Sequence, residues 1–179
     1  MAQRSARVVA PELVPGGTTE DGDGILLGAG PAVDVYIDFL CPFCRRFEEA
    51  SGAELEAIVD RGLGSVVYHP LGFLDRLSTT RYSSRAAAAS GCAALFANQP
   101  EEGGPGLSDY QLAQLGVALG LDPGFARCIG DGRYLDWSVF VTARAVEHGV
   151  TGTPSVFVDG ISVPANGQMI SAALEEISR

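Results

Sequence analysis

The sequence predicts an α/β fold in which a block of helices interrupts a sheet-forming domain. Three observations lead to this prediction. Strand-like and helix-like segments alternate over residues 32–77, only helical patterns follow over residues 78–148, and strand patterns return over residues 149–179. At 179 residues, the chain is long enough for one domain with a sizeable core, or for a small domain that carries an insertion.

The first sheet-forming part follows an extended lead-in. Residues 1–31 are rich in Gly, Pro and Asp, and an Asp-Gly pair in TTEDGDGILLGAG favours a hairpin turn. The apolar, β-branched stretch AVDVYIDFL predicts a buried strand. Apolar positions at helical spacing in PFCRRFEEASGAELEAIVDRG predict a helix that stops at Gly62, and SVVYHPLGFL predicts a second strand. This order indicates a right-handed parallel unit.

The helical block over residues 78–148 contains several predicted helices. They correspond to the stretches SSRAAAASGCAALFANQ, LSDYQLAQLGVALG, DPGFARCIG and RYLDWSVFVTARAVEHG. Ser108, followed three residues later by Gln111, is a capping-box pattern that marks the start of the second of these helices. The run GGPG at residues 103–106 marks a long loop.

The last part, residues 149–179, returns to strands. TPSVFVDG and ISVPANG are short strands joined by Asp159-Gly160, a strong hairpin signal, and QMISAALEEISR is an amphipathic helix. The complete order is typical of a thioredoxin-type sheet. The predicted fold class is therefore α/β, a thioredoxin fold with an inserted all-helical domain.

The composition excludes several classes of function. A formal net charge of -10 at pH 7 argues against binding to nucleic acid or to anionic membranes. All 12 basic residues are arginine, which excludes a Schiff-base lysine, a pyridoxal phosphate anchor and a P-loop lysine. No apolar run approaches the roughly 18 residues that span a bilayer, and the N-terminus lacks the apolar core of a signal peptide. We expect no cofactor.

Two of the four cysteines, Cys41 and Cys44, lie at the junction of a predicted strand and a predicted helix. A helix N-terminus stabilises a thiolate through its unpaired amides and its dipole, and Pro42 suits the first helical turn. Arg45 and Arg46 add positive charge. We therefore expect the pKa of Cys41 to fall from about 8.5 toward the range of about 3.5 to 7 found for activated C-x-x-C thiols. Cys41 is then the attacking thiol and Cys44 the resolving thiol.

A bare C-x-x-C also fits a structural disulfide or half of a zinc site. The strand before the pair and the helix after it favour redox chemistry. A zinc site built from all four cysteines fails on spacing, because structural zinc sites usually bring their ligands as two close pairs and this sequence has one. We expect no metal site.

Five stretches together resemble the DsbA-like thiol-disulfide oxidoreductases, a branch of the thioredoxin superfamily. In the order of that family they are DFLCPFCRRFE, VVYHPLGFLD, AAAASGCAALFANQP, LSDYQLAQLGVALGLD and GVTGTPSVFVDG. The resemblance covers roughly residues 20–179. It implies that Cys41 and Cys44, with Pro42 and Phe43 between them, form a redox-active pair.

The resemblance also assigns a role to Thr153 and Pro154. In the family, the proline that matches Pro154 is cis and packs against the active-site disulfide. A cis bond before proline is rare enough to mark a specific structural role. We expect it here, with the backbone of Thr153 free to pair with an extended client peptide.

Three residues are candidates for proton transfer or for tuning of the thiolate. Some relatives carry a buried acid six residues before the first cysteine, where this sequence has Val35. Asp38 is either a nearer substitute or a strand-end carboxylate. Arg45 adds charge beside the pair. His69 follows the second strand and either faces the active-site surface or is a surface or hydrogen-bonded strand-end histidine.

Cys92 and Cys128 both lie in the helical block, on different predicted helices. As a disulfide they would constrain the insertion and remove roughly 4 kcal/mol of loop entropy from the unfolded chain. Two buried, reduced cysteines are the alternative. Some DsbA-like proteins of the cell envelope carry a second disulfide here, so the resemblance favours pairing and an oxidising compartment. We therefore expect an extracytoplasmic protein, exported or tethered through an N-terminal segment absent from this sequence; a cytosolic protein is the alternative.

The leading expectation is an oxidase that introduces disulfides into exported proteins through Cys41 and Cys44. Its partners would be unfolded or folding exported proteins with free thiols and, as the resemblance implies, a membrane reoxidant of the DsbB or VKOR type; we expect no nucleic acid and a monomer. Thr153 resembles the disulfide isomerases more than some oxidases, so an isomerase or reductase on the same scaffold is one alternative. A non-catalytic sensor or binding domain of a larger membrane protein is another.

Overall fold

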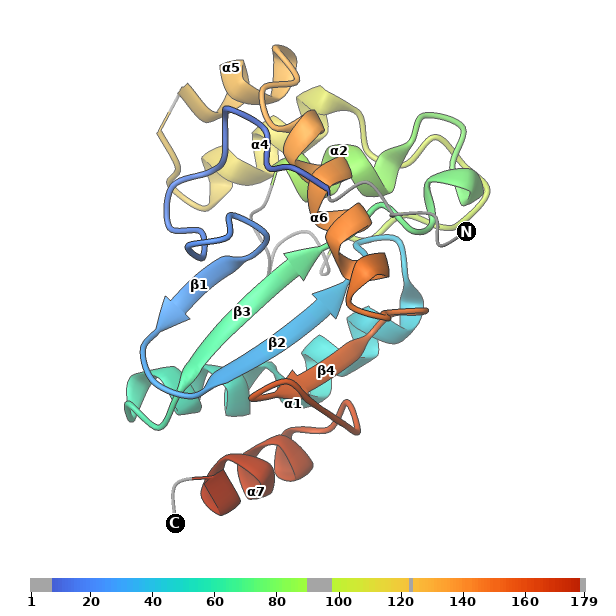
Figure 1. Ribbon diagram of the computed structural model, residues 1–179. Coiled ribbons are helices and arrows are strands. Elements are labelled where there is room, and N and C mark those ends of the chain that lie inside the picture. Colours follow the sequence, from blue (N-terminus) through green and yellow to red (C-terminus); the bar gives the residue numbers. More distant parts are fainter. Residues whose placement is uncertain (1–7, 90–97, 123, 178–179) are drawn as a thin grey trace, which may run out of the picture.

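The computed structural model describes residues 8–89, 98–122 and 124–177. Its centre is a five-stranded sheet in the order β1-β3-β2-β4-β5 (Figure 1). The strands are β1 (Ile25–Gly28), β2 (Ala32–Ile37), β3 (Ser65–Pro70), β4 (Ser155–Val158) and β5 (Ile161–Val163). Strands β2 and β3 are parallel, and the other neighbouring pairs are antiparallel. Together with its helices, this sheet confirms the predicted thioredoxin fold.

Two helices complete the sheet-forming part. Helix α1 (Pro42–Asp60) connects β2 to β3, and α7 (Gly167–Ile177) follows β5 and packs on α1. Helix α1 ends one residue before Arg61, and Gly62 has a φ of +64°, a left-handed conformation that favours glycine and explains the predicted stop. Asp159 and Gly160 also have positive φ, as a two-residue hairpin turn between β4 and β5 requires.

The helical block lies beyond the ends of β2 and β3 (Figure 1). A short 3-10 helix, η1 (Asp75–Leu77), precedes it, and its described helices are α2 (Tyr82–Ala89), α4 (Asp109–Ala118), α5 (Gly124–Gly130) and α6 (Leu135–Glu147). Ser108 caps α4 through the predicted capping box with Gln111. In the described part of the chain, no helix combines the length and the apolarity needed to cross a membrane.

Two apolar clusters fill the two faces of the sheet, because alternate residues of β2 point to opposite sides. The cluster on one face joins β2 to α1 and α7 through Val33, Val35, Ile37, Leu55, Ile58, Ile170 and Leu174. It continues into α2 and α4, and it contains both Cys41 and Cys44. The second cluster joins β2 to α6 through Tyr36, Leu71, Trp137, Phe140 and Val141. The cysteine pair therefore lies where the sheet core meets the helical block.

Strand β1 is the main addition to the predicted fold. Residues of the lead-in form a turn in which Thr18 pairs with Ile25, and β1 then runs antiparallel to β3 at the sheet edge. Apart from Ile25, which is half-buried, β1 is exposed and so lacks the alternating apolar pattern by which a strand is recognised in sequence. The predicted strand AVDVYIDFL is also shorter than expected, since β2 ends at Ile37.

Trp137 provides a test of the second cluster. Its side chain is fully buried, and the indole N–H donates to the Gly22 carbonyl at 2.7 Å. Replacement Trp137→Phe leaves that carbonyl without its donor and opens a cavity, so the free energy of unfolding in urea should fall by about 2 kcal/mol. The control Val139→Ala changes a half-exposed position of the same helix and should alter it by less than about 0.5 kcal/mol. Equal stability of Trp137→Phe and the wild type would contradict this packing.

Candidate active site

The turn between β2 and α1 positions the cysteine pair. Since β2 ends at Ile37 and α1 begins at Pro42, Cys41 is the N-cap residue of α1. Its N–H donates to the Asp38 carbonyl at 3.0 Å, and its own carbonyl accepts hydrogen bonds from the N–H groups of Cys44 at 3.1 Å and Arg45 at 3.2 Å. The backbone thus closes a tight turn that fixes both thiols at one helix end, as the sequence predicts.

The two thiols are present in the free form but differ in their surroundings. The Cys44 side chain is fully buried, and the Asp38 N–H donates to its Sγ at 3.5 Å. Cys41 retains 5% exposure, and its neighbour Phe43 is 62% exposed. A reactant that arrives from solvent therefore meets Cys41, while Cys44 stays behind it.

Thr153 and Pro154, in the loop before β4, lie beside the cysteine pair. The Cys41 Sγ lies 3.4 Å from the Thr153 carbonyl oxygen, although the two residues are 112 positions apart. The Thr153-Pro154 peptide bond is cis, and both residues are half-buried beside the start of β4. The structure thus joins the N-terminus of α1 to the loop before β4.

The pKa values of the two thiols move in opposite directions. A hydrogen bond with the Cys44 side chain, helped by Thr153 and by the N–H groups of Cys44 and Phe43, lowers the pKa of Cys41 to about 5 against the effect of burial. Burial, followed by the interaction with Cys41, raises the pKa of Cys44 far above its ordinary value. At neutral pH, Cys41 is a thiolate and Cys44 a thiol.

Arg45 and Arg46 were expected to stabilise the Cys41 thiolate, but both interact with other groups. The Arg45 guanidinium forms an ion pair with Glu49 at 2.8 Å on the exposed face of α1. The Arg46 guanidinium lies over the Phe43 ring, 4.4 Å from its centroid. The contributions that lower the pKa of Cys41 are hydrogen bonds with Cys44, Thr153 and Phe43, and neither arginine is among them.

Asp38 and His69 occupy different places. Asp38 is fully buried in the turn before Cys41. His69 is buried on the opposite face of the sheet, where its ring stacks on Tyr36 at 4.2 Å and its Nε2 lies 3.0 Å from an Asp34 carboxylate oxygen. The structure therefore brings Asp38 to the cysteine pair and places His69 in a hydrogen-bonded strand position, the second of the two alternatives for that residue.

One contact at the site has no signal in the sequence. The Gln99 amide, from the segment before the long loop, donates to the Phe39 carbonyl at 3.1 Å and so attaches the helical block to the active-site turn. A glutamine in a polar connection is too common to indicate such a contact. Only the tertiary fold brings these residues together.

The structure describes one of the two remaining cysteines. Cys128 is half-buried on α5, whereas Cys92 lies outside the described residues, so the Cys92–Cys128 disulfide stays a prediction. Within the described ranges, no group of three or more His, Cys, Asp or Glu side chains is arranged to hold a metal ion.

A five-stranded thioredoxin sheet with paired cysteines at the start of α1 defines a thioredoxin-type protein. Residues 22–176 match the protein family described as Thioredoxin, and the chain belongs to that family. Within it, the chain is similar to reduced DsbA from Mycobacterium tuberculosis, with a TM-score of 0.76, 29% sequence identity, and coverage of 87% of this chain and 92% of that chain. The comparison confirms the predicted DsbA-like class.

Two further relatives come from the same organism. Reduced DsbG from Mycobacterium tuberculosis superimposes with a TM-score of 0.69 at 28% identity and covers 95% of this chain and 86% of that chain. The serine/threonine-protein kinase PknE of Mycobacterium tuberculosis is 32% identical over an alignment of 167 residues that covers 79% of this chain and 29% of the kinase. The chain thus spans less than a third of the length of this curated relative.

The different environments of the two thiols predict different reactivity. Cys41 should react with iodoacetamide in a pH profile with a midpoint near 5, because its pKa is lowered to about 5, and Cys44 should stay unreactive at neutral pH. Mass spectrometry of the peptides would follow each cysteine separately. In denaturant, as a control, both should titrate near about 8.5. A midpoint near about 8.5 for Cys41 in the folded protein would contradict the described geometry.

Proposed function

We propose that this chain is a thiol-disulfide oxidoreductase that introduces disulfides into exported proteins through Cys41 and Cys44. The observation that carries the proposal is the asymmetry of the pair: a nearly buried thiolate at a helix start in front of a fully buried thiol. A stable thiolate favours the reduced form of the pair, and a disulfide whose reduced form is stabilised is a strong oxidant.

The exchange proceeds in two steps. A client thiolate attacks the Cys41 Sγ of the Cys41–Cys44 disulfide; a mixed disulfide forms, and Cys44 leaves as a thiolate that takes up a proton because burial raises its pKa. A second client thiolate then attacks the client sulfur of the mixed disulfide. The client disulfide forms, and Cys41 leaves as a thiolate, which its pKa of about 5 makes a good leaving group. The client loses two electrons and the pair gains them.

The client approaches over Phe43 and the loop before β4. Phe43 is exposed beside Cys41 and offers apolar contact to an unfolded segment. The half-buried Thr153 lies against the Cys41 Sγ, so an extended client backbone that pairs with this loop brings its own cysteine to Cys41. Clients are thus unfolded or folding proteins with free thiols, and we expect the protein to act as a monomer.

The place of action follows from the chemistry. An oxidising pair is useful in a compartment that does not keep thiols reduced, so we place the protein outside the cytoplasm, in the periplasm or cell envelope. Each turnover leaves the pair reduced, and a membrane reoxidant of the DsbB or VKOR type is the partner that would restore the disulfide.

A disulfide isomerase or reductase on the same scaffold is a second candidate, and Thr153 before Pro154 favours it. A redox-sensing or binding domain is a third, since part of a protein named as a kinase, PknE, matches this chain. An isomerase acts best on scrambled disulfides. A sensor binds a specific protein and turns over slowly.

Single replacements of the cysteines test the two assigned roles. With a disulfide-bonded client, reduced Cys44→Ser should accumulate a mixed disulfide at Cys41, because the resolving thiol is missing, whereas Cys41→Ser should form none. Non-reducing electrophoresis and mass spectrometry detect the adduct. Val139→Ala, at a half-exposed position of α6, serves as the control and should behave like the wild type. A Cys41→Ser protein that still oxidised reduced clients would refute the assignment.

The choice of client state separates the oxidase from the isomerase. The oxidised protein should restore activity to fully reduced ribonuclease A faster than the reduced protein restores it to scrambled ribonuclease A, because the stable Cys41 thiolate makes the disulfide the reactive form. Initial rates of ribonuclease activity measure both reactions. A higher rate with the scrambled client would support the isomerase, and slow turnover with both would support the sensor.

A further inference from the structure

The carboxylate of Asp38 is enclosed at the redox site. Its side chain is fully buried, and both oxygens accept backbone hydrogen bonds: Oδ1 from the Leu40 N–H at 2.9 Å and Oδ2 from the Leu74 N–H at 2.9 Å. In the described part of the chain, no ion pair joins it to a cation. The charge of this carboxylate is therefore stabilised by the two backbone N–H groups and the Ser83 hydroxyl, with no paired cation, and burying such a charge costs free energy.

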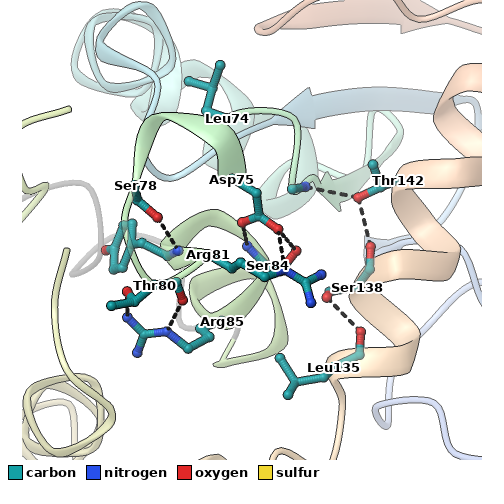
Figure 2. A network of polar contacts seen from close by, with 12 residues as sticks. Leu74, Asp75, Ser78, Thr80, Arg81, Ser84, Arg85, Leu135, Ser138 and Thr142 are labelled. Carbon is teal, nitrogen blue, oxygen red and sulfur yellow. Dashed lines mark hydrogen bonds and ion pairs between the residues drawn. The ribbon is translucent and has the colours of Figure 1, made fainter. Parts of the chain in front are cut away.

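The loop that supplies the Leu74 N–H is itself held in place. Leu71 donates from its N–H to the Ile37 carbonyl at 2.7 Å, and Gly72 donates to the Thr142 hydroxyl of α6 at 2.9 Å. Figure 2 shows the next link, in which the Asp75 carboxylate accepts from the N–H and the hydroxyl of Ser84 at 2.9 and 2.6 Å. A Cβ on Gly72 would collide with the Ser84 hydroxyl, so the loop packs closely against α2 at this point.

The same turn holds Asp38 against the thiols. Its N–H donates to the Cys44 Sγ at 3.5 Å, and its carbonyl accepts from the Cys41 N–H at 3.0 Å. Burial raises the pKa of Asp38 to about 6, and the Cys41 thiolate adds to the rise. The other titratable groups that face it are neutral near pH 6, since burial raises the pKa of Cys44 strongly and that of Tyr82, on α2, to about 12.

We propose that Asp38 is a positioning residue that acts through Cys41: its rigidly held, buried carboxylate repels the Cys41 thiolate and limits how far the reduced form of the pair is stabilised. The inference rests on the proposed thiol-disulfide exchange at Cys41 and Cys44. Asp38 thus weakens the oxidising power that the helix start gives to the disulfide.

The repulsion exists only when both groups are charged, and this sets its pH dependence. In the disulfide form there is no thiolate, so the Asp38 carboxyl loses its proton more readily than in the reduced form. When the pair accepts two electrons, Cys44 takes up one proton, Cys41 remains a thiolate, and Asp38 takes up a fraction of a second proton near its own pKa. Below about pH 6 the carboxyl is protonated and the repulsion is absent.

Asp38→Asn removes the charge and tests the inference. At pH 8, the equilibrium with reduced and oxidised glutathione should shift toward the reduced protein by about threefold or more relative to the wild type. At pH 5 the difference between the two proteins should largely disappear. Equal equilibria at pH 8, or an equal shift at both pH values, would overturn the proposal.

Asp75→Asn is the matched control. It removes a carboxylate that fixes the same loop but does not bond to the turn of the cysteines, so it should lower thermal stability and leave the glutathione equilibrium unchanged. A shift as large as that of Asp38→Asn would show a general effect of loop packing and would overturn the proposal.

Asp38→Asn exchanges one hydrogen-bond acceptor for a donor and so loses stability. A second measurement therefore uses the wild-type protein alone. Carboxyl ¹³C resonances followed with pH should give a higher pKa for Asp38 in the reduced protein than in the oxidised protein. Identical values in both forms would overturn the inference while leaving the exchange reaction intact. Failure of the wild type to exchange with glutathione at all would instead refute the proposed function and the inference with it.

Discussion

The turn from β2 into α1 is the constraint on which the site depends. By ending the strand at Ile37 and starting the helix at Pro42, it places Cys41 at the helix N-cap and Cys44 one turn deeper in the core. Two chemically identical side chains then have very different environments: donors surround the Cys41 Sγ, and apolar side chains surround Cys44. Thiol-disulfide exchange needs one sulfur that is a good leaving group and a second, less accessible sulfur that resolves the mixed disulfide. The different environments of Cys41 and Cys44 meet both requirements.

The helical block does more than cover the sheet. The Gln99 amide holds the turn at Phe39, and the loop before η1 brings the Leu74 N–H to the Asp38 carboxylate. These contacts come from segments far from the cysteines in sequence. They place a buried carboxylate beside the thiolate with little freedom to move away, so a charge that opposes the thiolate is part of the same framework that stabilises it.

Local signals account for most of what the sequence predicts correctly. The capping box of Ser108 and the Asp159-Gly160 turn depend on neighbouring residues and can be read directly. What the sequence does not predict depends on tertiary contacts. Strand β1 is short and mostly exposed, and Arg45 forms its ion pair with Glu49. One donor to the Asp38 carboxylate is the backbone N–H of Leu74, 36 positions away, and a backbone donor cannot be recognised from the residue type.

The reduction potential of the Cys41–Cys44 couple, measured at equilibrium with glutathione, tests the central claim most directly. A thiolate stabilised at the start of α1 makes the disulfide oxidising, so the value should lie between about -120 and -180 mV. A value near about -270 mV would be that of a reductase. It would show that the helix start does not stabilise the Cys41 thiolate enough to drive client oxidation, and it would contradict the account.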